Sequence, residues 1–229
     1  MALQKWVRLP SNWIRREGLR ELQWERDGRG SDNIAALMTL TAIAHHANKE
    51  GGVARLTYDA RCYMTGLSRA KLSNGLDVLE RIKVVERTPE GRSSYKLSNF
   101  NLNGGWAMLP AGCMYSSGKI VAFNDFHLRN ATELNALKLF FLFVAQRGTD
   151  TNMANIGYDK IEDYTAIDRS KIKAAISRLA VIPLVYVEQV PSKRNELGFA
   201  NAYRIVGLNS YKHMGTMGRG KDAYDFNEV

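Results

Sequence analysis

The sequence predicts a mostly helical α+β protein that contains two copies of one unit. Three observations predict this fold class. The chain aligns with itself without a gap at an offset of 100 residues and is identical at 16 of the 80 positions from 6 to 85. Each copy carries helical apolar patterns followed by a strand, a turn and a second strand. The chain of 229 residues is 45% hydrophobic and 24% charged, a balance typical of folded domains with a buried core.

The internal repeat divides the chain into two units and a tail. Because a fixed period of this length marks a repeated structural unit, we expect one domain at residues 1–104 and a second at residues 105–208. Residues 209–229 are rich in glycine and polar residues without an apolar period, which indicates a flexible tail. The identities that define the repeat include Trp6 and Trp106, Tyr58 and Tyr158, Arg69 and Arg169, and Lys71 and Lys171.

The longest apolar pattern of each unit predicts its first helix. In the first unit, Ser31 and Asp32 offer an N-cap to an apolar series that ends near Gly51. The equivalent helix opens at Thr132 and is apolar on nearly every side over residues 134–145, so we expect it to be the more buried of the two. An apolar helix of this kind fits either the core between the units or a dimer face.

Two shorter helices and a β-hairpin complete each unit. The third helix of the first unit spans residues 69–81 with Ser68 placed to cap it, and Asp168 takes the cap position in the second unit. Helix, short helix, turn, helix and hairpin is the element order of a winged helix, which is a helix-turn-helix with a β-wing. The second helices are predicted at residues 58–64 and 158–164, and the hairpin strands at 84–87, 94–97, 184–190 and 202–206.

Composition narrows the location and the partner of the protein. The longest apolar run, residues 139–145, is well short of a membrane span, and no secretory signal is recognisable, so we expect a cytoplasmic protein without a membrane partner. Cys62 and Cys113 are far apart in sequence and are expected to be free thiols. The 32 basic and 23 acidic residues give a net charge of +9, which favours an anionic partner and nucleic acid above all.

The third helices carry most candidate DNA-binding residues. Arg69 and Lys71, with their repeats at 169 and 171, start both helices, where basic groups and a helix N-terminus meet phosphates. Exposed Asn suits adenine and exposed Lys suits guanine in a major groove. The candidates are Arg69, Lys71, Ser73, Asn74, Asp77 and Arg81 in the first unit, Arg169, Ser170, Lys171, Lys173, Ser177 and Arg178 in the second, and Arg87, Arg92, Lys193 and Arg194 in the hairpins.

No group of residues predicts catalysis, a metal site or a cofactor. The four histidines lack zinc-ligand spacing with one another or with the cysteines, and no glycine-rich phosphate loop follows a strand. We therefore expect a protein that is not an enzyme. His45 and His46 end the first helix, where burial or the helix dipole explains them. The repeated Trp6 and Trp106 are expected to pack their segments onto their own domains.

The stretch from residue 58 to 97 and its repeat from 158 to 190 resemble the helix-turn-helix proteins of plasmids and phages. The tandem arrangement is similar to that of plasmid replication initiators, which have two winged-helix domains and bind iterated origin repeats. This resemblance implies a sequence-specific binder of double-stranded DNA from a mobile element that acts in DNA replication or transcription regulation. If both third helices engage adjacent major grooves, their half-sites should lie about 10–10.5 base pairs apart.

Two other functions stay open. One or both units could instead serve as a winged-helix protein-interaction module, an adaptor subunit that docks a protein of the replication or transcription machinery in a larger nucleoprotein complex. An RNA-binding subunit of a ribonucleoprotein is the third alternative. The sequence leaves open whether the chain works as a monomer or a homodimer.

Overall fold

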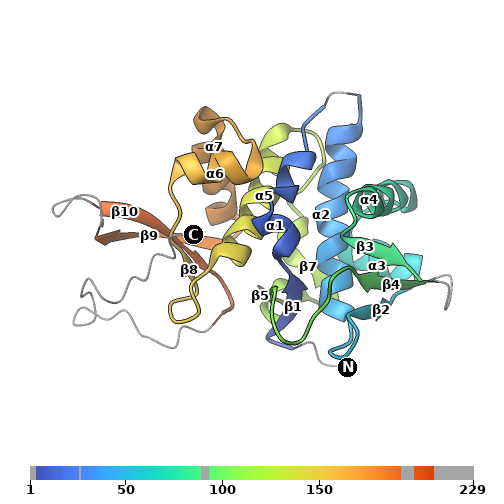
Figure 1. Cartoon of the computed structure of the whole chain (residues 1–229). Helices are drawn as coiled ribbons and strands as arrows, with labels where there is room; N and C mark the ends of the chain where they lie inside the picture. Colours follow the sequence, from blue (N-terminus) through green and yellow to red (C-terminus); the bar gives the residue numbers. More distant parts are fainter. Residues whose placement is uncertain (1–3, 26, 89–92, 192–198, 209–229) are drawn as a thin grey trace.

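Two long helices form the centre of the molecule. The computed structural model describes residues 4–25, 27–88, 93–191 and 199–208, and within them the chain is an α+β structure with seven α-helices and small antiparallel sheets. Helices α2 (Arg29–His46) and α5 (Ala131–Gln146) pack against each other, and the other elements surround them (Figure 1). The fold is thus organised around one helix from each half of the sequence.

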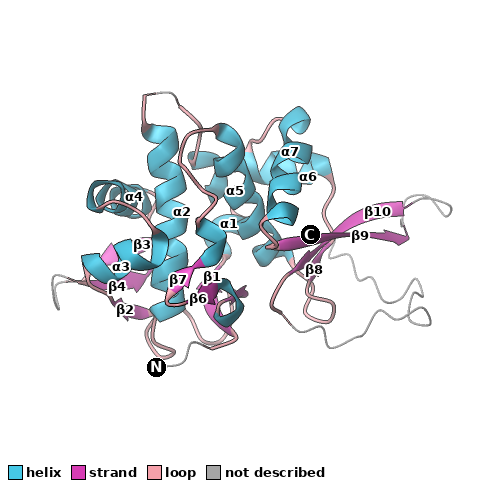
Figure 2. Ribbon diagram, turned by 180° about the vertical axis from the view of Figure 1, so that it is seen from behind, coloured by secondary structure: helices cyan, strands magenta, loops and turns pink. Residues whose placement is uncertain are grey.

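Helices α4 and α7 lie on opposite flanks of this central pair. Helix α4 (Arg69–Arg81) packs on α2, and α7 (Arg169–Val181) packs on α5. The shorter helices α3 (Tyr58–Thr65) and α6 (Tyr158–Thr165) precede them. Both views place α4 and α7 at the two sides of the molecule (Figures 1 and 2). Each can therefore present its outward face without hindrance from the other.

Local signals set the start of both flanking helices as predicted. The Ser68 hydroxyl accepts a hydrogen bond from the backbone N–H of Lys71 at 3.3 Å, and the Asp168 carboxylate accepts one from the N–H of Ser170 at 2.8 Å. Gly75 allows α4 to approach α2 closely, since a Cβ at this position would lie 2.8 Å from the backbone of Ala35. The bounds predicted for α4 agree with the structure.

Two three-stranded antiparallel sheets flank the helices. One has the strand order β2-β4-β3 and the other β8-β10-β9, so a hairpin directly follows α4 and another follows α7. The hairpin of β9 and β10 projects from the body of the protein, at the left in Figure 1. The strands are β2 (Val53–Arg55), β3 (Val85–Arg87), β4 (Ser94–Leu97), β8 (Met153–Ala154), β9 (Val185–Pro191) and β10 (Phe199–Ile205).

A strand from each half joins the two halves of the chain. Strands β1 (Trp6–Pro10) and β5 (Trp106–Pro110) pair antiparallel, with Trp6 opposite Pro110. The rings of Trp6 and Trp106 stack with centroids 5.9 Å apart and planes 10° apart. Each tryptophan was expected to pack its segment onto its own domain. Strand β1 does contact α2 and β5 does contact α5, but the antiparallel pairing also stacks the two rings on each other across the halves.

The first half also contacts the second through its N-terminal segment. The side chain of Arg15 donates to the carbonyl of Ala145 at 2.9 Å, and that of Arg20 to the carbonyl of Asp163 at 2.7 Å. The main cluster of buried apolar residues extends from Val7 to Leu208 and draws on both halves. The remaining short elements are α1 (Asn12–Arg15), β6 (Tyr115–Ser116), β7 (Lys119–Ile120) and the 3-10 helices η1 (Gly18–Glu21), η2 (Gly112–Met114) and η3 (Val121–Phe123).

The two central helices are equally buried, contrary to the expectation that α5 is the more buried one. In α2, 14 of 18 residues are buried, and in α5, 12 of 16. Helix α2 is enclosed because α4 covers one side and α5 another. The residues of α5 from Leu134 to Ala145 are all buried within the chain except the polar Asn135, which is half-buried. This burial favours the core interpretation of that helix.

The ends of the central helices differ from those predicted. Helix α2 begins three residues before Asp32, behind Gly28, whose φ of 100° lies in the left-handed region. Ser31 and Asp32 are thus inside the helix, and Asp32 binds residues of α4 instead of capping. Helix α5 begins one residue earlier than predicted, capped by Asn130, and α2 ends well before Gly51.

His45 is a buried connection between the halves. Its Nδ1 lies 3.0 Å from the Tyr115 hydroxyl and its Nε2 lies 2.9 Å from the Pro110 carbonyl oxygen. Burial lowers the pKa of His45 to about 3, so the ring is neutral at physiological pH. Cys62 and Cys113 are free, as predicted.

Candidate nucleic-acid interface

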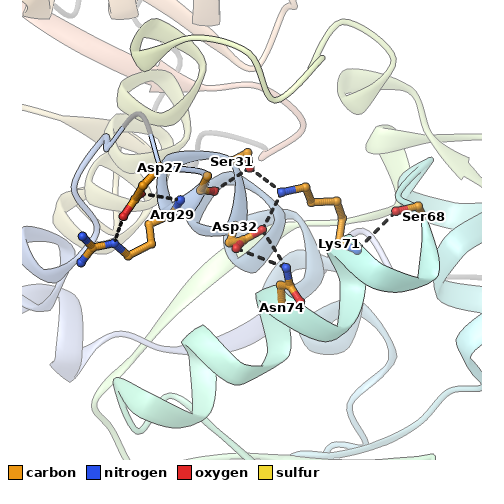
Figure 3. Close-up of polar contacts among 8 residues, drawn as sticks. Asp27, Arg29, Ser31, Asp32, Ser68, Lys71 and Asn74 are labelled. Carbon is orange, nitrogen blue, oxygen red and sulfur yellow. Dashed lines mark hydrogen bonds and ion pairs between the residues drawn. The ribbon is translucent and has the colours of Figure 1, made fainter.

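The N-terminal half of α4 is tied to neighbouring helices by its own basic and amide side chains. The Lys71 ammonium lies 2.7 Å from the Asp32 carboxylate, and the Asn74 amide donates to the same carboxylate at 3.2 Å (Figure 3). Arg69 forms an ion pair with Asp59 of α3 at 2.5 Å. Three of the predicted DNA-binding side chains of α4 therefore already have partners inside the protein.

The C-terminal half of α4 engages the following hairpin. Arg87 of β3 lies 2.5 Å from the Asp77 carboxylate and 3.2 Å from that of Glu80. Ser73 is half-buried, whereas Arg81 is exposed. The two acidic residues of α4 thus neutralise Arg87, which was predicted to contact DNA. Arg92, which was also predicted to contact DNA, lies outside the described residues.

A shallow cavity lies between the start of α2 and α4. Its volume is about 280 Å³. Arg29 stands at its edge and is held by Asp27, whose carboxylate accepts a hydrogen bond from the Arg29 backbone at 3.0 Å and one from its side chain at 2.6 Å. These bonds lower the pKa of Asp27. The lining residues are Arg29, Asp32, Asn33, Asn74, Asp77, Val78 and Arg81, so two arginines and two carboxylates share one hollow.

Helix α7 differs from α4 in its charge. Its sequence RSKIKAAISRLAV contains four basic residues and no acidic one, whereas α4, RAKLSNGLDVLER, contains three basic and two acidic residues. Lys171, Lys173 and Ser177 are exposed. Across the described ranges, neither Lys171 nor Lys173 forms an ion pair, although the Asp168 carboxylate is close enough to Lys171 to interact electrostatically. The outward face of α7 is consequently a cationic surface.

Three other predicted residues of α7 have structural partners. Arg169 forms an ion pair with Asp159 of α6, which is the counterpart of the contact between Arg69 and Asp59. Ser170 is engaged by the capping Asp168, and its hydrogen bonds lower the pKa of that carboxyl. Arg178 is half-buried, donates to the carbonyl of Asp125 and lies 3.6 Å from Glu133. Lys193 and Arg194 lie outside the described residues.

Sequence reasoning missed the role of two residues at the start of α2. Asp32 was interpreted as a cap but is the common partner of Lys71 and Asn74. Arg29 lines the cavity next to α4, and its identity with Arg129 in the repeat was a signal that pointed to it. Both roles depend on the contact between α2 and α4. This contact joins segments about 40 residues apart, so the local sequence pattern does not reveal it.

Two other kinds of functional feature are absent from the part of the chain that the structure describes. No cluster of three or more His, Cys, Asp or Glu residues suited to a metal ion occurs among the described residues. None of the helices in that same part of the chain has the length and apolarity needed to cross a bilayer. Comparison of the chain with protein-family models, curated proteins and solved structures gave no significant match.

Proposed function

We propose that the chain is a sequence-specific binder of double-stranded DNA that uses two tandem winged-helix units and acts in replication or transcription control of a plasmid or phage. The element order supports the proposal, since α4 and α7 each follow a short helix and precede a hairpin. Equivalent elements also begin 100 residues apart, as with β1 and β5, α3 and α6, and α4 and α7. The flanking positions of α4 and α7 suit contacts to two successive major grooves.

The observation that carries this proposal is the cationic face of α7. Lys171 and Lys173 are exposed, unpaired within the described residues and held on a rigid helix that packs on α5. Helix-borne lysines of this kind contact phosphates or pair with guanine in the major groove. Helix α7 contains no acidic residue that would offset this positive charge.

The two helices should contribute unequally. Helix α7 can engage DNA without breaking any ion pair of Lys171 or Lys173, whereas Lys71 and Asn74 of α4 must first leave Asp32. We therefore expect α7 to supply most of the salt-dependent affinity, because that affinity scales with the number of phosphates neutralised. Unequal helices also imply unequal half-sites rather than a perfect palindrome.

The first experiment is selection from a pool of random duplex DNA at about 150 mM salt with non-specific competitor. The proposal predicts enrichment of a bipartite motif with half-sites about 10–10.5 base pairs apart. Retention without enrichment would indicate phosphate binding alone, and no retention would contradict the proposal.

Charge-removing variants then test the role of α7. Lys171→Gln and Lys173→Gln should each reduce the slope of log affinity against log salt by about 1 if the lysine contacts a phosphate. Lys160→Gln is the matched control, since Lys160 is an exposed lysine of the neighbouring helix α6 with an ion-pair partner in Asp163. Unchanged affinity and slope in both α7 variants would exclude this helix as a DNA contact.

A set of exposed apolar side chains favours protein docking as the second candidate function. Val181 at the end of α7 is 81% exposed and Phe199 of β10 is 72% exposed. Tyr186 and Val187 of β9 are exposed as well. Tyr186, Val187 and Phe199 belong to one hairpin, and exposed apolar residues that gather on one surface are typical of interaction sites. Salt-independent binding of a partner protein that survives nuclease treatment and is lost in Phe199→Ser would support this function.

A further inference from the structure

The outer face of the β1–β5 ribbon is aromatic and cationic. Along β1, Val7 and Leu9 are buried in the core, while Trp6 and Arg8 between them are half-exposed. The Arg8 guanidinium lies over the Trp106 ring, 5.0 Å from its centroid, and Trp106 stacks on Trp6. Two indole rings and a guanidinium thus form a layer on the surface of the protein.

A cavity opens beside this layer. Its volume is about 250 Å³, somewhat below the range of about 300–1,000 Å³ that is usual for drug-sized ligands, so it suits a small ligand. Phe100 contributes a second aromatic wall. Its ring lies against the backbone of Gly52, where a Cβ would come within 2.4 Å of the ring. The lining residues are Gln4, Trp6, Val7, Arg8, Ala44, Ala47, Asn48, Lys49 and Phe100.

Several polar groups around the cavity have positive charges or hydrogen-bond donors without a partner in the described part of the protein. The Nε of Arg8 is buried and has no hydrogen-bond partner among the described residues. Lys49 is exposed, and in the described part of the chain it forms no ion pair. The Oδ1 of Asn48 accepts from the N–H groups of Gly51 and Val53 at 2.9 and 3.2 Å, so its amide nitrogen is the group that can donate to a ligand.

We propose that this cavity binds one nucleotide unit, with the base against Trp6 and Phe100 and the phosphate at Arg8 and Lys49. Aromatic walls stack on bases of any identity, and flanking cations pair with phosphates. A carboxylate ligand would not need two aromatic walls, and an apolar ligand would leave the charges of Arg8 and Lys49 without a partner. The nucleotide comes either from solution or from a single strand.

This site is separate from the proposed duplex interface. Ala44 and Ala47 place it at the C-terminal end of α2, whereas Asp32 and Asn33 face α4 near the N-terminal end. Asp32 and Ala44 are 12 positions apart in α2, which corresponds to about 18 Å along the helix. The proposal therefore does not depend on duplex binding by α7 and can be tested independently.

The test titrates the full chain with deoxythymidine 5′-monophosphate and with a 12-nucleotide oligothymidylate by calorimetry. Phe100→Leu should weaken both interactions about 5- to 100-fold, the range for loss of one stacked base. Lys49→Gln, an exposed change that leaves the core intact, should weaken them about 3-fold or more. Lys5→Gln is the matched control, because Lys5 is an exposed lysine next to the cavity that does not line it.

The outcomes separate the two sources of the nucleotide and the competing explanations. If the oligonucleotide binds more tightly than the monophosphate and both cavity variants weaken its binding as expected, the ligand is a single strand. If only the monophosphate binds and the same variants weaken its binding, the ligand is a free nucleotide. The proposal is overturned if neither probe binds, if Phe100→Leu and Lys49→Gln bind as the wild type does, or if inorganic phosphate displaces the monophosphate at equal concentration.

Discussion

Lys138 makes the most specific test of how the two halves are joined. This lysine of α5 is 1% exposed, and its ammonium donates to the carbonyl of Leu22 in the first half at 2.8 Å. Burial, with a smaller effect of the charge on Arg20, lowers the pKa of Lys138 from 10.5 to about 7. The informative variant is Lys138→Met, which keeps the volume of the side chain and removes the ionisable group.

The expected effect follows from the two pKa values. Between pH 7 and 10.5 the unfolded chain binds more protons at residue 138 than the folded protein, so the free energy of unfolding rises with pH in this window. At 1.36 kcal/mol for each pKa unit, the wild type should gain about 2–3 kcal/mol relative to Lys138→Met between about pH 6 and about pH 9. Loss of the bond to Leu22 adds a penalty of about 1–3 kcal/mol to the variant at every pH.

Urea unfolding of both proteins at these two pH values provides the measurement. Other titrating groups are common to the two proteins and cancel in the difference between their free energies of unfolding. A difference that is the same at both pH values would show that Lys138 titrates as a solvated amine, and the structural reasoning would be refuted. A wild type that loses stability relative to the variant as pH rises would refute it as well.

Three further substitutions test the packing and the caps. Gly75→Ala should lower the free energy of unfolding by about 1–3 kcal/mol, because its Cβ would meet the α2 backbone at 2.8 Å, and an unchanged melting temperature would contradict this close approach. Trp106→Leu should lower the free energy of unfolding by about 0.5–1.5 kcal/mol more than the lost buried area accounts for, because it removes the stack on Trp6. In thermal melts, the same substitution should therefore lower the stability less in a Trp6→Leu protein than in the wild type. Ser68→Ala should destabilise the protein by about 0.5–2 kcal/mol, with Ser68→Gly less harmful, and denaturant midpoints of the two variants in the opposite order would reject the capping role.

Local sequence signals were sufficient for the flanking helices and most of the hairpins. The spacing of Leu72, Leu76 and Leu79 places one apolar stripe on α4, and Ser68 marks its start, so the predicted bounds 69–81 match the structure. The predicted strand 94–97 also matches β4. These elements could be predicted from the sequence because capping and apolar periodicity depend on residues only a few positions apart.

The candidate DNA surface was only partly predictable. Helical periodicity placed Lys173 on the outward face of the helix and Lys171 on its flank, and both side chains are exposed in the structure. It could not show that Lys71 and Asn74 meet Asp32, since that contact depends on how α4 packs on α2. A surface charge is available to bind DNA only if no residue of a neighbouring element pairs with it. The periodicity of one helix contains no information about such residues.

The sequence by itself determined two similar sets of helices and hairpins, a positive net charge and the cationic face of α7. Only the tertiary structure decided that β1 pairs with β5, that Trp6 stacks on Trp106 and that Lys138 bonds to Leu22. The physical reason is that these contacts join residues about 100 positions apart. Their free energy comes from burial and pairing between distant segments, and the pattern within either segment does not specify its partner.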